Sequence, residues 1–76
     1  MPLHDDPWTD KAKRLLRAEM ARNGVTYEEL AARLAAIGVS DNAPNLRNKV
    51  SRGAFTAVFL LQCMKALGSR NLRLDP

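Results

Sequence analysis

The spacing of glycines and helix-capping residues limits most strongly what this chain can fold into. The sequence has four glycines, and each follows a stretch with a helical pattern: Gly24, Gly38, Gly53 and Gly68. Glycine readily adopts the left-handed conformation that ends helices, so each one is a natural stop. With 76 residues there is room for one small domain only. The sequence therefore predicts a single all-α domain of four to five helices.

The first predicted helix begins near Thr9, taken as its N-cap, with Asp10 in the first turn. Its inward pattern has apolar residues three and four apart and is interrupted only at Glu19. The helix is expected to stop at Asn23–Gly24.

The second helix has the clearest start in the chain. Thr26 and Glu29 have the T-x-x-E spacing of a capping box, and Val25 and Leu30 sit where a hydrophobic staple requires them. The helix should run to Gly38. Its predicted apolar stripe consists of Leu30, Ala31, Leu34 and Ile37.

The third helix is predicted within residues 42–53, "NAPNLRNKVSRG". Pro44 has no N–H to donate, so it must lie in the first turn, which favours Asn42 as the N-cap and Gly53 as the stop. At about 100° per residue, three residues form a narrow inward stripe. They are Ala43, Leu46 and Val50.

The opposite side of this helix combines amides with a guanidinium. Asn45, Asn48 and Arg52 project there, and residues 42–53 contain no Asp or Glu. Asparagine can pair with adenine and arginine with guanine through two hydrogen bonds each. The alternative is an ordinary polar surface on which asparagines cap helices and fill turns, and Asn42 could have only that role.

The fourth helix, "AVFLLQCMKAL", is expected between an N-cap at Thr56 and a stop at Gly68. Nine of its eleven residues are apolar, whereas a surface helix needs only one apolar stripe. This composition predicts burial on most sides, either at the centre of the fold or across a dimer interface.

The tail, residues 69–76, alternates Leu72 and Leu74 with polar residues. It could form a short strand or fold back onto the core. With the fourth helix it supplies the predicted homodimer interface, which consists of Phe59, Cys63, Leu72 and Leu74.

Positive charge is concentrated in the second half of the chain. The net charge is +4; residues 1–41 hold six Lys or Arg against seven Asp or Glu, and residues 42–76 hold six against Asp75 alone. A localised basic half suggests a polyanionic partner. A solvated basic surface that aids solubility is the alternative.

Residues for catalysis or metal binding are scarce. His4 is the only histidine and Cys63 the only cysteine, so the chain cannot assemble a zinc set or an internal disulfide. Glu28 and Glu29 point about 100° apart and do not form a catalytic pair. Trp8 is expected to be a core residue and not a ligand contact. We expect a non-enzyme without cofactor or metal.

Three further features favour a cytoplasmic protein. No stretch approaches the roughly 18 apolar residues of a membrane span, and the N-terminus lacks the apolar region of a secretory signal. A single cysteine also suits a reducing compartment.

Together, the segments "VTYEELAARL", "IGVS", "NLRNKVSRG" and "FTAVFLLQCMKALG" resemble the lambda-repressor/Cro-like (Xre) helix-turn-helix fold. The chain also looks like a small, poorly characterised group of bacterial proteins with the same "NLRNK", "SRG" and "FLLQC" core. The resemblance implies residues 1–8 as an N-terminal arm, 9–68 as the DNA-binding domain and 69–76 as a tail. The intervals from Ala31 to Gly38 and from Gly38 to Gly53 are longer than in the family.

The resemblance implies that the third helix enters the major groove of DNA, with a phosphate contact just after the second N-cap. The implied base contacts are Asn42, Asn45 and Asn48. The expected phosphate contacts are Tyr27, Arg47, Lys49, Arg52, Arg14 and Arg17. We therefore expect a homodimeric transcriptional regulator that binds double-stranded DNA at the nucleoid. The alternative is a protein–protein interaction module, antitoxin-like or phage-encoded, that uses the fourth helix and tail. RNA binding is a weaker third option, because aromatic residues make up only 5% of the chain.

Overall fold

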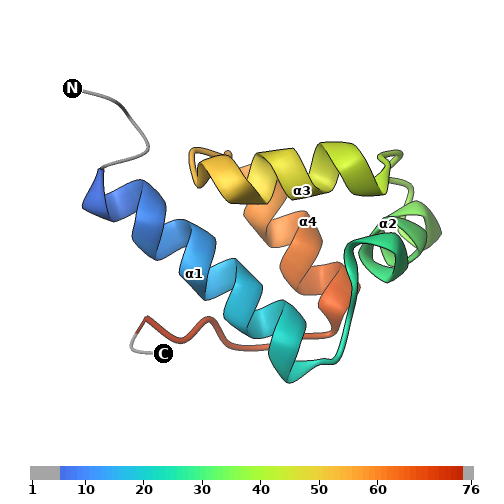
Figure 1. Ribbon diagram of the computed structural model, residues 1–76. Helices are drawn as coiled ribbons and strands as arrows, with labels where there is room; N and C mark the ends of the chain where they lie inside the picture. The colour runs from blue at the N-terminus through green and yellow to red at the C-terminus, as the bar shows by residue number, and fades with distance from the viewer. Residues whose placement is uncertain (1–5, 75–76) are drawn as a thin grey trace.

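A computed structural model of the chain describes residues 6–74 and shows four helices and no strand in that range. The helices are α1 (Pro7–Arg22), α2 (Tyr27–Ala36), α3 (Ala43–Arg52) and α4 (Ala57–Leu67) (Figure 1). The predicted all-α class is confirmed with four helices. The strand considered for the tail is wrong for the described residues, which fold back instead, with Ser69 hydrogen-bonded to Glu19 of α1.

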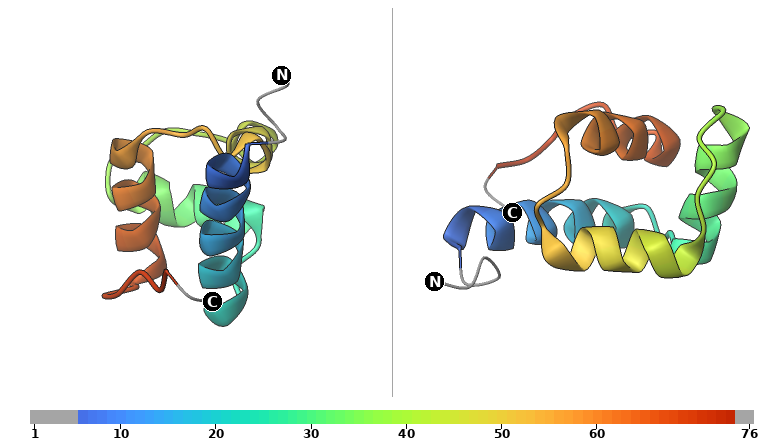
Figure 2. Two further views of the ribbon diagram at one scale, coloured as in Figure 1. Left: turned by 90° about the vertical axis from the view of Figure 1, so that its left-hand side faces the viewer. Right: turned by 90° about the horizontal axis from the view of Figure 1, so that it is seen from above.

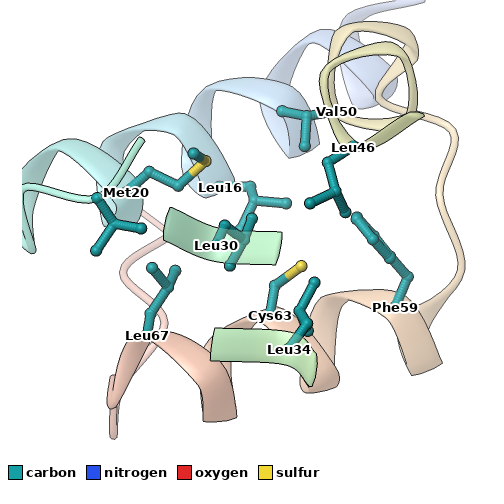
Figure 3. Packing of buried hydrophobic residues seen from close by; sticks show 10 residues of the cluster. Leu16, Met20, Leu30, Leu34, Leu46, Val50, Phe59, Cys63 and Leu67 are labelled. Carbon is teal, nitrogen blue, oxygen red and sulfur yellow. The ribbon is translucent and has the colours of Figure 1, made fainter. Parts of the chain in front are cut away.

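The four helices enclose one core. Both α1 and α2 pack against α3 and α4, and α2 runs crosswise to the other three and closes one end (Figure 2). The core cluster takes side chains from every helix (Figure 3). Its buried members are Leu16, Met20, Val25, Leu30, Leu34, Leu46, Val50, Phe59, Cys63 and Leu67.

The first helix begins earlier than predicted. Its N-cap is Asp6, whose Oδ1 accepts a hydrogen bond of 2.8 Å from the backbone N–H of Trp8. Pro7 occupies the first turn, where a missing N–H costs nothing. The predicted N-cap at Thr9 is therefore wrong, and Pro7 and Trp8 belong to the helix, not to an arm. Residues 1–5 of the predicted arm, with His4, lie outside the described residues.

The other helix starts are confirmed. Thr26 Oγ1 accepts from the backbone N–H of Glu29 at 3.1 Å, and the Glu29 carboxylate reaches back to the Thr26 N–H, completing the capping box. Thr56 Oγ1 accepts from the N–H of Phe59 at 3.0 Å. Asn42 caps α3. These side chains satisfy backbone donors that the first turn of a helix leaves unpaired.

Two apolar residues expected in the core lie on the surface instead. Trp8 is 75% exposed because the first turn of α1 extends past the core, whose first α1 member is Leu16. Ile37 is exposed because α2 ends at Ala36; Val39 packs against the core in its place.

Glu19, which interrupts the apolar pattern of α1, is buried. Its carboxylate pairs with Arg22 and accepts a 2.9 Å hydrogen bond from Ser69 Oγ. Asn23 Nδ2 donates to the same Ser69 oxygen at 3.2 Å. A buried carboxylate is stabilised by such partners, and here it fastens the start of the tail to α1.

The end of α3 lies against the start of α1. Gly53 has φ +68°, in the left-handed region, and is buried. A Cβ atom added there would overlap the backbone carbonyl of Thr9. Glycine is needed at this position both for the backbone conformation and for the close approach of the two helices.

Candidate nucleic-acid interface

The outward side of α3 carries the residues that the sequence placed there. Leu46 and Val50 are fully buried, as predicted, and point into the core. Asn45, Asn48 and Arg52 are exposed; we call these three residues the outer face of α3. No residue of 6–74 forms an ion pair with Arg52.

Asn42 does not belong to this face. Its Oδ1 accepts a hydrogen bond of 2.9 Å from the backbone N–H of Asn45, which caps α3. A bidentate contact to adenine would require the same amide oxygen. The capping role considered for Asn42 is confirmed, and it competes with the base contact predicted for this residue.

Three of the predicted phosphate contacts meet on one side of α3. Tyr27, Arg47 and Arg17 line a groove of about 640 Å³ between α1, α2 and α3. The Arg47 guanidinium lies 5.2 Å from the centre of the Tyr27 ring, and an Arg17 nitrogen donates to Ser51 Oγ at 3.1 Å. Glu28 lies 4.0 Å from Arg47, and both side chains are largely exposed, so this ion pair is weak.

Lys49 lies on the other side of α3 and is already paired. Its Nζ lies 2.7 Å from Oδ2 of Asp41, whose side chain is almost fully covered, and 5.2 Å from the centre of the Phe59 ring. The hydrogen bond from Lys49 holds the pKa of the Asp41 carboxyl below its ordinary value, against the effect of burial; the Asn42 N–H and the Asn45 side chain contribute less. An ammonium held in this way is a poorer phosphate ligand than the sequence suggested.

Arg52 is the freer cation on that side. With Lys49, Phe55 and Phe59 it borders a hollow of about 260 Å³. The two phenyl rings are 5.5 Å apart and tilted by 55°. The predicted phosphate residues beside α3 thus separate into two groups, with Asn48 of the outer face between them: one group has Arg17, Tyr27 and Arg47, and the other has Lys49 and Arg52.

Arg14 belongs to neither group. It pairs with Asp10, one turn earlier on α1, and the Arg14 hydrogen bond lowers the pKa of the Asp10 carboxyl. The structure does not bring Arg14 to either groove beside α3.

The predicted dimer residues do not form one surface. Phe59 and Cys63 are 7% and 0% exposed in the protomer's own core, so the prediction that they face a second chain is wrong. Burial raises the pKa of the Cys63 thiol to about 12, which leaves it protonated and unreactive near neutral pH. Leu72 and Leu74 are exposed.

The fourth helix leaves one stripe exposed within the protomer. Val58 and Leu61 are 63% and 68% exposed, so burial at the centre of the fold does not account for this stripe, and its burial across a dimer interface stays a prediction. The other helices leave this stripe of α4 uncovered, and the apolar composition of α4 exceeds what its buried side needs.

Two neighbours of these basic side chains were not predicted from the sequence: Ser51, which lies beside Arg17 and Arg47, and Asp41, which pairs with Lys49. Ser51 lies four residues after Arg47, and this spacing could have placed it on the same side of α3. Asp41 lies eight residues before Lys49 and outside the helix, so no helical spacing connects them.

Neither a metal centre nor a membrane helix is found among the described residues. Within 6–74, no group of three or more His, Cys, Asp or Glu side chains could hold a metal ion. None of the four helices combines the length and apolar character needed to cross a bilayer.

Fold and site together define a four-helix, all-α domain whose third helix presents a polar outer face between basic side chains. The chain belongs to the family described as "Domain of unknown function (DUF6471)", whose model matches residues 8–72. Neither the curated proteins nor the solved structures contain a significant match. The family's description names no activity, so function has to be argued from the site.

Proposed function

We propose that this protein is a transcriptional regulator that binds double-stranded DNA and inserts α3 into the major groove. We assign it to the lambda-repressor-like helix-turn-helix class and place it at the nucleoid in the bacterial cytoplasm, as a binding protein, not an enzyme. One observation carries the proposal: the exposed amide of Asn48 on α3 lies between two groups of basic side chains, Arg17 with Arg47 and Lys49 with Arg52.

The dimensions of an α-helix support this proposal. A helix with its side chains is about 10–12 Å wide, and the major groove is about 12 Å wide. Cations on opposite sides of such a helix would approach the phosphates of both strands. Arg17 and Arg47 lie on one side and Arg52 toward the other, while Asn48 points between them. Phosphate contacts would orient the domain, and the amides would read base edges.

The helix pair α2–α3 also supports the helix-turn-helix class. The two helices pack against each other, with six residues, 37–42, between them. Tyr27, one residue after the α2 N-cap, lies beside Arg47 of α3. A phosphate bound there would contact both helices of the pair, as docking of this motif requires.

We propose that two copies bind adjacent half-sites, since one α3 helix presents few base-reading groups. Phe59 and Cys63 are not available for contact between the copies, because both are buried. Sedimentation with and without a bound duplex would measure the number of copies. A 1:1 complex on every duplex would contradict the dimer without affecting groove binding.

Fluorescence anisotropy with a labelled random-sequence duplex would test DNA binding. We expect binding at low salt and a steep loss of affinity as salt rises. Arg47→Ala should reduce the slope of log K against log salt by about 0.9. Arg33→Ala is the matched control, because Arg33 is exposed and borders neither groove beside α3. The proposal fails if no duplex binds at low salt, or if both variants change the slope equally.

A second function, a protein–protein interaction module, is favoured by a different observation. Val58 and Leu61 of α4 are more than half exposed, and Leu72 and Leu74 of the tail that follows α4 are exposed as well. Exposed apolar groups that gather in one region often mark an interaction surface. The two functions use different faces and are compatible.

A further inference from the structure

The groove between α4 and the tail has an apolar floor. It encloses about 320 Å³, and its apolar lining comes from Leu60, Leu61, Met64 and Leu72. Met64 is buried, whereas Leu61 is 68% exposed and stands at the edge of the groove. Val58, Leu61 and Lys65 are spaced i, i+3 and i+7, so they form one outward stripe along α4.

The tail wall of this groove is held in place by hydrogen bonds. Ser69 N–H donates to the Met64 carbonyl at 3.0 Å, and Ser69 Oγ donates to the buried Glu19 carboxylate at 2.9 Å. Asn23 Nδ2 donates to Ser69 Oγ at 3.2 Å. These bonds fix the start of the tail wall before a partner arrives, and this lowers the entropic cost of binding there.

The rim of the groove is positively charged. Lys65 and Arg70 line it, and among the described residues no acidic side chain does. Residues 42–74 contain no Asp or Glu at all. Neither Lys65 nor Arg70 forms an ion pair within the described range 6–74. Two unpaired cations beside an apolar floor complement a ligand that is apolar on one face and acidic at its margins.

We propose that this groove binds an acidic amphipathic helix of a partner protein. Apolar residues of that helix, three and four apart, would pack on Leu61, Met64 and Leu72, as in other helix-in-groove complexes. Its Glu or Asp side chains would pair with Lys65 and Arg70. The inference rests on the interaction-module function proposed above and is independent of DNA binding by α3.

A second copy of this chain fits the groove less well. A two-fold symmetric dimer places the same patch of both copies face to face. Lys65 and Arg70 of one copy would then meet the same cations of the other, and like charges across an interface are unfavourable. Charge complementarity therefore favours a different, acidic protein.

The test uses the whole chain and three dye-labelled synthetic helices of about five turns each. The first has leucines three and four apart with glutamates elsewhere, the second has lysines in place of the glutamates, and the third has serines in place of the leucines. Fluorescence anisotropy measures each affinity. We expect the Glu–Leu helix to bind at least about tenfold more tightly than either other helix.

Protein variants then locate the site. Lys65→Glu with Arg70→Glu, and separately Leu61→Gln, should each weaken the Glu–Leu helix about tenfold or more. All three side chains are exposed, so these variants should fold. Arg33→Glu is the matched control: it reverses an exposed charge on α2 outside the groove and should leave the affinity nearly unchanged.

Other outcomes overturn the inference in distinguishable ways. If the Lys–Leu helix binds as tightly as the Glu–Leu helix, the interaction module stands but the acidic partner is wrong. If the chain self-associates in sedimentation experiments and Leu61→Gln abolishes this, the occupant is a second copy. If no helix binds and the chain is monomeric, the interaction module fails as well. None of these results bears on duplex binding by α3.

Discussion

The third and fourth helices are alike in length and in the residues that begin and end them, but their exposed faces differ in chemistry. α3 has ten residues and α4 eleven; each starts at a polar N-cap and ends at a left-handed glycine. Their inner faces both pack into the core, where Leu46 of α3 and Cys63 of α4 are fully buried. Outward, α3 presents amides and guanidinium, whereas α4 presents Val58 and Leu61.

This contrast separates the residues that specify the fold from those that can specify partners. Inward residues of both helices meet the same apolar core, so they are constrained alike. Outward residues contribute little to stability, and we propose that their difference reflects what each face binds. A polar, basic face suits DNA, and an apolar face with cations at its margin suits an acidic protein. Four pairs of substitutions test whether the two helices differ in this way.

The largest expected effect separates an inner face from an outer one. Leu46→Ala should lower the free energy of unfolding by about 4 kcal/mol, because the side chain is fully buried and its removal leaves a cavity. Leu61→Ala should change it by less than about 0.5 kcal/mol, because this leucine is mostly exposed. Urea denaturation measures both. Similar losses for the two variants would show that α4 buries its outer face against something in solution.

The second pair compares the stops of the two helices. Gly53 and Gly68 both have positive φ, +68° and +73°, so alanine is strained at either position. Only at Gly53 would the new Cβ overlap a neighbouring backbone, that of Thr9; at Gly68 it meets open space. Gly53→Ala should cost about 3 kcal/mol and Gly68→Ala about 1. Equal costs, measured by thermal unfolding, would contradict the close approach of α1 and α3.

The third pair tests the outer faces against DNA. Asn48→Ala should reduce discrimination at one base position by about 1–3 kcal/mol, because its amide is exposed on the outer face of α3. Leu61→Ala, on α4, should leave DNA binding unchanged. Competition between duplexes that differ at single positions measures the discrimination. A loss in the α4 variant and not in the α3 variant would reverse the assignment of the two faces.

The smallest expected effect concerns a paired and an unpaired lysine. Lys49 of α3 pairs with Asp41, whereas Lys65 of α4 has no ion pair within 6–74. The pKa of Asp41 is lowered by folding, so the pair's contribution is present above the ordinary Asp pKa of about 3.9 and is lost as pH falls through the lower folded pKa.

Asp41→Asn should therefore destabilise the protein by up to about 1 kcal/mol at neutral pH and less below about pH 4. Lys65→Ala should show no such pH dependence. Unfolding midpoints of each variant and of the wild-type chain, measured at neutral pH and below about pH 4, give the loss of stability under both conditions. A constant deficit for Asp41→Asn at both pH values would mean that its role is not electrostatic.

The positions of the helices could be predicted from the sequence, because a capping residue lies close along the chain to the backbone groups that it satisfies. The capping box at Thr26 and Glu29, the Asn42 cap and the Thr56 cap all lie within three residues of the groups they satisfy. The start of α1 is predicted three residues too late because Thr9 is also a good cap; Pro7, which fits the first turn of a helix as Pro44 does in α3, points to Asp6.

The exposure of individual side chains was harder to predict, because it depends on how far the core extends along each helix. Exposure of Trp8 and Val58 follows from which helix lies opposite them, and periodicity does not contain that information. The pairing of Asp41 with Lys49 joins a loop to a helix, and the link between Ser69 and Glu19 spans fifty residues. The outer face of α3 was predictable because it depends only on the helical repeat.

Selection of bound sequences from a random pool of duplexes would show whether the outer face of α3 reads DNA. For the wild-type chain we expect enrichment of a short motif, repeated as a palindrome if two copies bind, and a loss of preference at one position of the motif for Asn48→Ala. If the wild-type chain enriches no motif and retains no duplex even at low salt, the outer face of α3 does not read DNA, and the proposed function is wrong.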